Sequence, residues 1–388
     1  MSSGTNFAVV HRMASQRAKL PVNMNQPVHP HQVEHNHLSS DSSIADALAC
    51  AFSYDTDVLA VGTTKGGVKL LHGTANFRPS SFELTSAMCR GEAMRSAVTC
   101  CRFRPGFDRG TKDLLLVGNT DGSISEWHLG SAQMVFSDTQ PGTEIYAVDY
   151  EPTGAFFCSA GKDTFVRLYD SARKCNMTTL RQTVLSDTSD AHSNRVQAVR
   201  WIDSNTILSG GWDQTVQMWD VRQQKAVNRI FGPYLCGDGL DAHGAMIVTA
   251  STRPTSNLQM WDSRSLKPLC EFRFPDAPST SDSVEPYASN LFAAKFSPDG
   301  RYLAAGGSLD FRVFDVKRTF AEAKFAPGGG GGGGDAAAEP KSVTPVDCGR
   351  VLHDGGVNAA VFSIAWGGNS TVAAVGYGCS LNVLRSSG

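Results

Sequence analysis

The 388-residue sequence lacks several features that would assign it to a common functional class. No stretch approaches 18 consecutive apolar residues, which excludes a helical membrane span, and the N-terminus lacks the apolar core of a secretory signal. Ten cysteines include no Cys-x-x-Cys pair, the spacing typical of zinc and redox sites. With 35 basic and 37 acidic residues, the net charge of −2 favours neither nucleic acid nor an anionic membrane. We therefore expect an intracellular protein, cytoplasmic and/or nuclear.

The sequence also has little that would support catalysis or cofactor binding. Gly237–Ala242 loosely matches a dinucleotide-binding glycine motif, but a strand pattern follows it where a helix is required. The glycine run Gly328–Gly334 has no Gly-Lys-Ser/Thr after it. A polar, Pro-bearing stretch with nothing to preorganise a metal site holds the histidines His29, His31, His35 and His37. The prediction is a protein that is not an enzyme and has no cofactor or metal.

One phrase recurs along the chain. Its clearest copy, Ile207–Asp220, has two apolar residues, Ser-Gly-Gly, Trp-Asp and then a strand ending in Trp-Asp. Weaker copies cover Val58–His72, Leu114–His128, Phe156–Asp170, Ile247–Asp262, Leu303–Asp315 and Thr371–Arg385. The aromatic residue near the end of the phrase recurs after 42 positions, from Trp127 to Tyr169 and from Trp219 to Trp261. A period of roughly 40–45 residues with several short strands predicts propeller blades.

With these repeats the chain resembles the WD-repeat β-propeller family. The resemblance implies an all-β fold, a seven-bladed β-propeller of four-stranded antiparallel blades over residues 44–388. Blade seven has only three strands near the C-terminus, and an unpaired edge favours aggregation, so we expect an N-terminal strand to close the ring. Residues 1–43 are otherwise predicted to be a mostly disordered tail. Flexible insertions are predicted at about 275–287 and 318–345.

In this family four side chains bind the strands of a blade together, and blade four carries matching residues. They are His192, Ser209, Asp213 and Trp219. A buried Trp N–H and a buried imidazole need partners, which such a chain of groups supplies. Ser, His and Asp also compose the catalytic triad, but their places in the repeat favour a structural tetrad. Other blades keep parts of the pattern, namely Asp121, Trp127, Ser159, Asp163, Tyr169, Trp261 and Phe314, whereas blades one and seven have Leu71 and Leu384.

Trp212, in the turn directly before Asp213, is the residue that most suggests binding. In the family that turn lies on the narrow top face, and Trp is over-represented at interface hot spots. Arg195 and the equivalent turn positions extend the predicted surface, with Thr120, Lys162, Arg253 and Tyr377. Aromatic and cationic groups around a channel mouth suit an acidic peptide, through bidentate Arg and cation–π contacts.

A second feature is the repeated Trp-Asp-x-Arg box at residues 219–222 and 261–264. The stretch Ile207–Arg222 resembles the box of substrate receptors of cullin-based ubiquitin ligases, in which the terminal Arg contacts the adaptor subunit. By that resemblance Arg222 and Arg264 are candidate adaptor-binding residues. Many unrelated WD-repeat proteins also carry Trp-Asp-x-Arg, because Arg is well placed to pair with the Asp.

Two functions therefore follow from the sequence. The first is a non-catalytic scaffold that binds protein or peptide partners on its top face and rim, within a multi-subunit complex. The alternative is a substrate receptor of a cullin-based ubiquitin ligase. Nucleic acid is not an expected partner, because the charge is balanced.

Overall fold

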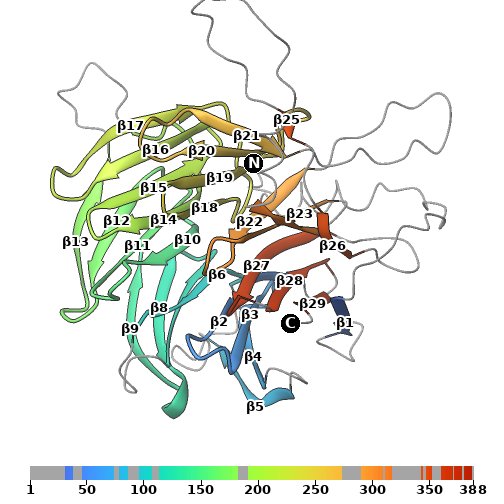
Figure 1. Cartoon of the computed structure of the whole chain (residues 1–388). Coiled ribbons are helices and arrows are strands. Elements are labelled where there is room, and N and C mark those ends of the chain that lie inside the picture. The colour runs from blue at the N-terminus through green and yellow to red at the C-terminus, as the bar shows by residue number, and fades with distance from the viewer. Residues whose placement is uncertain are drawn as a thin grey trace, which may run out of the picture.

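The computed structural model describes residues 31–37, 46–73, 78–85, 96–106, 113–181, 191–272, 290–308, 311–316, 342–343, 347–351, 360–369, 371–377 and 380–386. These residues form 29 β-strands. The strands are ordered into seven sheets arranged as a ring (Figure 1). None of the helical segments in the described residues is long and apolar enough to cross a membrane.

The first four blades each contain four antiparallel strands that follow one another in the chain. Blade one contains β2 (Ala47–Phe52), β3 (Val58–Thr63), β4 (Gly67–His72) and β5 (Arg78–Thr85). Blade two contains β6 (Val98–Phe103), β7 (Leu114–Asn119), β8 (Ser123–His128) and β9 (Gln133–Thr139). Blade three contains β10 (Ile145–Tyr150), β11 (Phe156–Gly161), β12 (Val166–Asp170) and β13 (Cys175–Leu180). Blade four contains β14 (Val196–Asp203), β15 (Thr206–Gly211), β16 (Thr215–Asp220) and β17 (Lys225–Phe231).

The last three blades include the departures from this order. Blade five contains β18 (Leu240–His243), β19 (Met246–Ala250), β20 (Leu258–Asp262), β21 (Pro268–Phe272) and a fifth strand, β25 (Ser342–Val343). Blade six contains β22 (Leu291–Phe296), β23 (Tyr302–Gly307), β24 (Phe311–Asp315) and β26 (Asp347–Val351). Blade seven contains β27 (Val361–Gly367), β28 (Thr371–Gly376), β29 (Ser380–Ser386) and β1 (His31–His37).

The ring closes as predicted, by an N-terminal strand. β1 pairs antiparallel with β29, from His31 opposite Ser386 to His37 opposite Ser380. The backbone ladder that β1 supplies removes a free edge from the last blade. Of the predicted tail, residues 1–30 and 38–43 lie outside the described residues, as do 275–287 and most of 318–345. The exception is β25, which falls inside the second predicted insertion and pairs parallel with β21.

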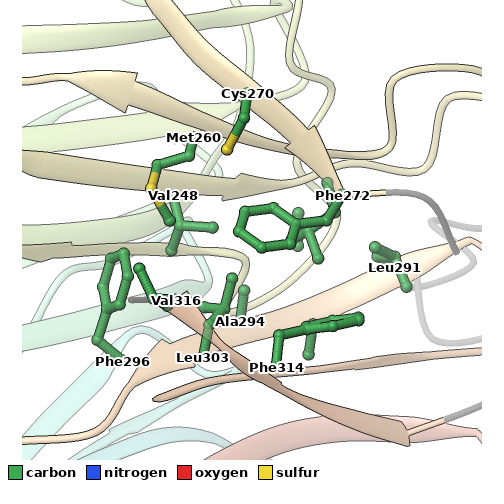
Figure 2. Packing of buried hydrophobic residues seen from close by; sticks show 13 residues of the cluster. Val248, Met260, Cys270, Phe272, Leu291, Ala294, Phe296, Leu303, Phe314 and Val316 are labelled. Atoms are coloured by element: carbon green, nitrogen blue, oxygen red, sulfur yellow. The ribbon is translucent and has the colours of Figure 1, made fainter. Parts of the chain in front are cut away.

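The hydrophobic core is divided into seven clusters, one between each pair of neighbouring blades, including blades seven and one. Figure 2 shows the cluster in which Met260 and Phe272 of blade five face Leu303 and Phe314 of blade six. The rings of Phe272 and Phe314 lie 5.4 Å apart. Because each sheet is buried on both faces by its neighbours, the strands need apolar residues at successive positions, as β7 does. This explains why continuous apolar runs accompany each repeat.

The first strand of every blade lies nearest the centre of the ring (Figure 1). At one equivalent position of these strands, blades two to six carry alternating charges, Arg102, Asp149, Arg200, Asp241 and Lys295. Asp149 accepts from Arg200 Nη1 at 3.1 Å, and Asp241 accepts from Arg200 Nε at 2.6 Å. Alternation allows each charge to face opposite charges across the blade boundary, which buried ions require.

Asp238, just before β18, completes this central charge ring. Its carboxylate accepts from Arg102 Nη2 at 2.8 Å and from Lys295 Nζ at 2.7 Å. Burial disfavours the charged form of Asp238, but Arg102 and Lys295 outweigh it and hold the pKa well below its usual range. Blades one and seven have Ala51 and Ala365 at the equivalent position. Three cations and three carboxylates thus balance inside the ring.

Candidate interaction surface

In blade four, the predicted tetrad residues form one chain of hydrogen bonds. The His192 ring lies between two partners, with Nδ1 at 2.7 Å from Asp213 Oδ2 and Nε2 at 2.6 Å from Ser209 Oγ. Trp219 Nε1 donates to the same Ser209 oxygen at 2.7 Å. Both ring nitrogens of His192 are engaged and the Ser209 side chain is fully buried. A hydroxyl in this setting is not presented to a substrate, so the geometry is that of a strand clamp.

Two other blades bind their Trp through residues that the sequence did not single out. In blade five, Trp261 Nε1 donates to Thr249 Oγ1 at 2.9 Å. Thr249 stands where Ser209 stands in blade four, so the repeat spacing alone would have found it. In blade two, Trp127 Nε1 donates to Ser125 Oγ at 2.9 Å on its own strand. No pattern based on the second strand predicts that bond, because Val117 occupies the Ser209 position.

The top face is built on a hydrogen bond that all seven blades repeat. In six blades the backbone N–H of the residue directly after the second strand donates to the carbonyl of the residue directly before the first strand. In blade five the equivalent bond joins Thr252, the second residue after β19, to Tyr234, which lies further from β18. The seven distances are 2.8–3.1 Å. The donor and acceptor residues are Thr64 and Asp46, Thr120 and Ala97, Lys162 and Glu144, Trp212 and Arg195, Thr252 and Tyr234, Ser308 and Asn290, and Tyr377 and Ala360. The turn residues therefore surround the channel mouth at one level.

This bond corrects one predicted position. Arg253 was expected to be the turn residue of blade five, equivalent to Trp212, but Thr252 makes the repeated bond instead. Counted from the second strand, Thr252 follows Ile247 by five residues, as Trp212 follows Ile207. The extra residues of the longer turn, in which the Ser251 N–H donates to the Asn257 carbonyl, come after this position. Arg253 Nη1 donates to the Gly232 carbonyl at 3.1 Å, which directs it toward the end of β17.

A cation–π and stacking cluster, made of Arg195, Trp212 and Tyr234, occupies the top of blades four and five. The Arg195 guanidinium carbon lies 4.9 Å from the centroid of the Trp212 ring. The Tyr234 ring lies 5.9 Å from Trp212 with an interplanar angle of 24°. All three side chains are partly exposed. The cluster brings together two of the predicted surface residues and adds Tyr234, which comes from the irregular entry to blade five.

Lys162 forms an ion pair with a carboxylate of its own blade. Lys162 Nζ lies 2.9 Å from Glu144 Oε1, and Tyr146 Oη donates to Glu144 Oε2 at 2.7 Å. Burial opposes ionisation of Glu144, but Lys162, Tyr146 and Arg195 outweigh it and lower the pKa. Arg195 has no ion pair at salt-bridge distance among the described residues. Arg195 thus contributes positive charge to this face together with Lys162 and Arg253.

Thr120 and Tyr377 belong to blades two and seven, which do not neighbour blade four in the ring. They lie at the mouth of the channel, as the cluster does, but they are not part of the cluster. The predicted ring of aromatic and cationic groups is thus concentrated on blades three to five.

Below the mouth, the channel contains a cavity of about 60 Å³ lined by the inner strands. Tyr146 and Cys236 line it near the cluster, and Arg102 and Asp238 line it deeper in the ring. Burial raises the pKa of the lining thiol Cys100 to about 12, which disfavours the thiolate that a nucleophile needs. Among the described residues no group of three or more His, Cys, Asp or Glu side chains could hold a metal ion.

The candidate adaptor-binding arginines lie on the opposite face, in the turns after β16 and β20. The Arg222 side chain is 71% exposed and donates from Nη2 to Asp220 at 3.2 Å. Arg264 is exposed as well, and its backbone N–H donates to Asp262 Oδ1 at 3.3 Å. Consecutive blades therefore present the two arginines with the same turn geometry.

A closed ring of radial four-stranded sheets around a narrow channel defines a β-propeller. Comparison with known families adds the type of repeat: the family described as "WD domain, G-beta repeat" matches residues 133–170 and 183–220. The first match spans the outer strand of blade two and the inner three strands of blade three. The first match thus links two blades, and the second contains β14, β15 and β16 of blade four. The chain therefore carries WD repeats and folds as a β-propeller.

Several curated relatives share about half of this chain. Protein tipD of Dictyostelium discoideum is 22% identical over 217 residues, which cover 56% of this chain and 33% of that protein. The ribosome biogenesis protein WDR12 homolog of Drosophila mojavensis is 24% identical over 51% of this chain and 40% of its own length. The pre-mRNA-processing factor 19 homolog 2 of Arabidopsis thaliana is 27% identical, covering 55% and 37%. The chain spans less than half of these relatives.

Proposed function

We propose that this protein is a non-catalytic interaction scaffold that binds an acidic peptide or protein segment on its top face. The observation that carries the proposal is the cluster of Arg195, Trp212 and Tyr234. A guanidinium held 4.9 Å from an indole ring keeps its charge while losing conformational freedom before binding. Trp, Tyr and Arg are also the residues most enriched among interface hot spots.

The electrostatics of the surrounding residues favour a carboxylate-bearing partner. Glu144 is bonded by Lys162 and Tyr146, whereas Arg195 acts on it only from beyond salt-bridge distance. Arg253 adds a second cation near the end of β17. Arg can hold a carboxylate through two parallel hydrogen bonds. The wider predicted surface, with Thr120 and Tyr377, would contact the remainder of the partner around the channel mouth.

A scaffold role also agrees with the relatives, whose names refer to ribosome biogenesis and pre-mRNA processing. Such processes use assemblies of many subunits inside the cell, so we propose an intracellular, multi-subunit complex as the setting. Rigid display accounts for the mechanism: the blades fix the turns, the turns present the side chains, and no bond is made or broken. The tetrad residues, being engaged with one another, serve the scaffold.

The test is affinity purification of the full-length protein with quantification of the proteins that accompany it. Trp212→Ala and Arg195→Glu should reduce the main partner by about 30-fold, the loss expected of a hot spot. Tyr54→Ala, which removes a 54% exposed aromatic side chain from blade one, is the matched control and should leave the partner bound. If both top-face variants retain the partners of the wild type while folded, the proposed surface is wrong.

The same purification tests the ligase-receptor alternative, which the exposure and spacing of Arg222 and Arg264 support. Arg222→Ala combined with Arg264→Ala should then remove a cullin adaptor and leave the top-face partner in place. Absence of any adaptor from the wild-type preparation would eliminate this alternative.

A further inference from the structure

The outer edge of blade five is occupied by another part of the chain. β25 pairs parallel with β21, with Ser342 opposite Glu271 and Val343 opposite Phe272 (Figure 1). This segment comes from the connection between the third and fourth strands of blade six. An extended segment can therefore add to the outer strand of a blade in this protein.

A repeated β-bulge determines where on the outer strand such pairing occurs. In blades two to five the ladder between the third and fourth strands shifts by one residue beside the Trp or Tyr position. The extra residues are apolar and 40–51% exposed: Val135, Met177, Val227 and Leu269. A bulge disrupts regular pairing, and β25 pairs only beyond it, at Glu271 and Phe272. The usable edge is short and lies near the end of the strand.

Blade four presents the same edge without an added strand. Arg229 pairs with Gln217 as Glu271 pairs with the equivalent Gln259, so Arg229 and Ile230 correspond to Glu271 and Phe272. Among the described residues no strand follows β17 in its sheet. The equivalent edges in blades two and three end in Thr139 and Leu180.

The next residue of β17, Phe231, is the most exposed large apolar side chain of the described residues, at 69%. The Arg229 guanidinium carbon lies 5.8 Å from the centroid of its ring, so charge and apolar surface are contiguous. Lys225 adds a cation on the same strand, and 221–237 contain no acidic residue. In blade five the carboxylate of Glu271 lies on the strand that pairs with β25, and in blade four Arg229 stands at the equivalent position of β17.

We propose that the β17 edge at Arg229–Phe231 binds an extended acidic segment of a partner protein, which adds in parallel as a fifth strand of blade four. Backbone groups of Arg229 and Ile230 form the short ladder, an acidic residue of the partner pairs with Arg229, and an apolar residue covers Phe231. Main-chain bonds supply the affinity and the alternate side chains supply the selectivity in this mode of recognition. The site does not include the cluster of Arg195, Trp212 and Tyr234, although Arg253 of the proposed top-face surface contacts the Gly232 carbonyl directly after it.

The chain itself provides the template for a probe. A labelled peptide with the sequence of residues 336–346, carrying Ser342→Glu and Thr344→Leu, places an acid opposite Arg229 and an apolar residue beside Phe231. The matched peptide carries Ser342→Lys instead. In fluorescence polarisation with the full-length protein, the acidic peptide should bind about 10-fold more tightly than the basic one, as expected for a favourable against a repulsive charge pair. N-methylation of the peptide's backbone amides at positions 343 and 344 should abolish binding, because strand addition needs the backbone donors.

Three variants of the protein locate the site. Arg229→Glu should reverse the preference between the two peptides, and Phe231→Ser should weaken both. Glu271→Arg alters the blade-five edge instead and should leave the acidic peptide bound as in the wild type. Equal affinity of the wild type for both peptides, or no reversal with Arg229→Glu, would overturn the proposal. If Phe231→Ser converts a dimer to a monomer in light scattering, the occupant is a second copy of this chain and the partner-segment proposal is wrong.

Discussion

Blades four and one occupy equivalent places in the same ring yet are held together by opposite chemistry. Blade four uses His192, Ser209 and Trp219, whose polar atoms bond one another inside the sheet. Blade one has Val61 and Leu71 at the Ser209 and Trp219 positions, both buried and purely apolar. The central ring shows the same contrast, with Arg200 in blade four and Ala51 in blade one.

The comparison shows that the same ring accepts a hydrogen-bonded set in one blade and an apolar set in another. A buried hydrogen-bonded set adds only a modest net stability, but one unsatisfied member costs its full desolvation energy. A blade that lost its Trp would therefore be expected to lose the accompanying polar groups as well. Blade one lacks all of them, and its core with blade seven is made of small aliphatic side chains such as Ala47 and Val375.

The largest expected effect comes from breaking the central charge ring that blade one does without. Asp238→Asn removes the carboxylate that both Arg102 and Lys295 contact, and leaves two buried cations facing each other. The free energy of unfolding should fall by about 3–5 kcal/mol. Urea denaturation followed by tryptophan fluorescence measures it.

The control for that variant is Arg173→Gln, which removes an ion pair with Asp170 in which the Arg side chain is 78% exposed. Its effect should be below about 1 kcal/mol, because solvent screens the pair. Equal losses from the two substitutions would contradict the view that the central ring is a buried network.

A reciprocal exchange between the two blades is the next largest effect. Ser209→Val in blade four leaves the Trp219 N–H and the His192 Nε2 without their partner, and should cost about 2–3 kcal/mol. Val61→Ser in blade one buries a hydroxyl among apolar side chains and should cost about 1–3 kcal/mol. Both are measured by the same denaturation. A neutral result for either exchange would mean that the site admits water.

The smallest expected effect is a pH dependence of the free energy of unfolding that comes from Asp213 of blade four. Blade one has Lys65 at the equivalent position and does not share it. Burial opposes ionisation of Asp213, but the hydrogen bonds from His192 and Thr215 outweigh it, so its pKa in the folded protein is lowered. A carboxyl with a lowered folded pKa stabilises the fold above its unfolded pKa of about 3.9, and this stabilisation is lost as the pH falls through the folded value.

Asp213→Asn should therefore reduce the free energy of unfolding by about 1 kcal/mol at pH 7, with a difference from the wild type that shrinks below about pH 4. Denaturation curves at a series of pH values measure it. A difference that stays constant down to about pH 3 would contradict an ionised Asp213 as the source.

The regular blades were predictable from sequence, because an apolar strand, a turn and a strand that ends in an aromatic residue and Asp recur, as from Phe156 to Asp170 and from Ile207 to Asp220. Blade five shows the limit. Its irregular entry contains Tyr234, which completes the aromatic cluster, and Thr252 stands at the Trp212 position with Arg253 one place further on.

The amino-acid sequence by itself determined the repeat, the all-β ring and the tetrad of blade four, because these depend on short-range patterns that each blade carries within one period. Tertiary structure alone decided which side chains meet across blades: the stacking of Arg195, Trp212 and Tyr234, the ion pairs of Asp238, and the seating of β25 on β21. Those contacts join residues from different blades. Their geometry is fixed only when the ring closes, because closure sets the distances between neighbouring blades.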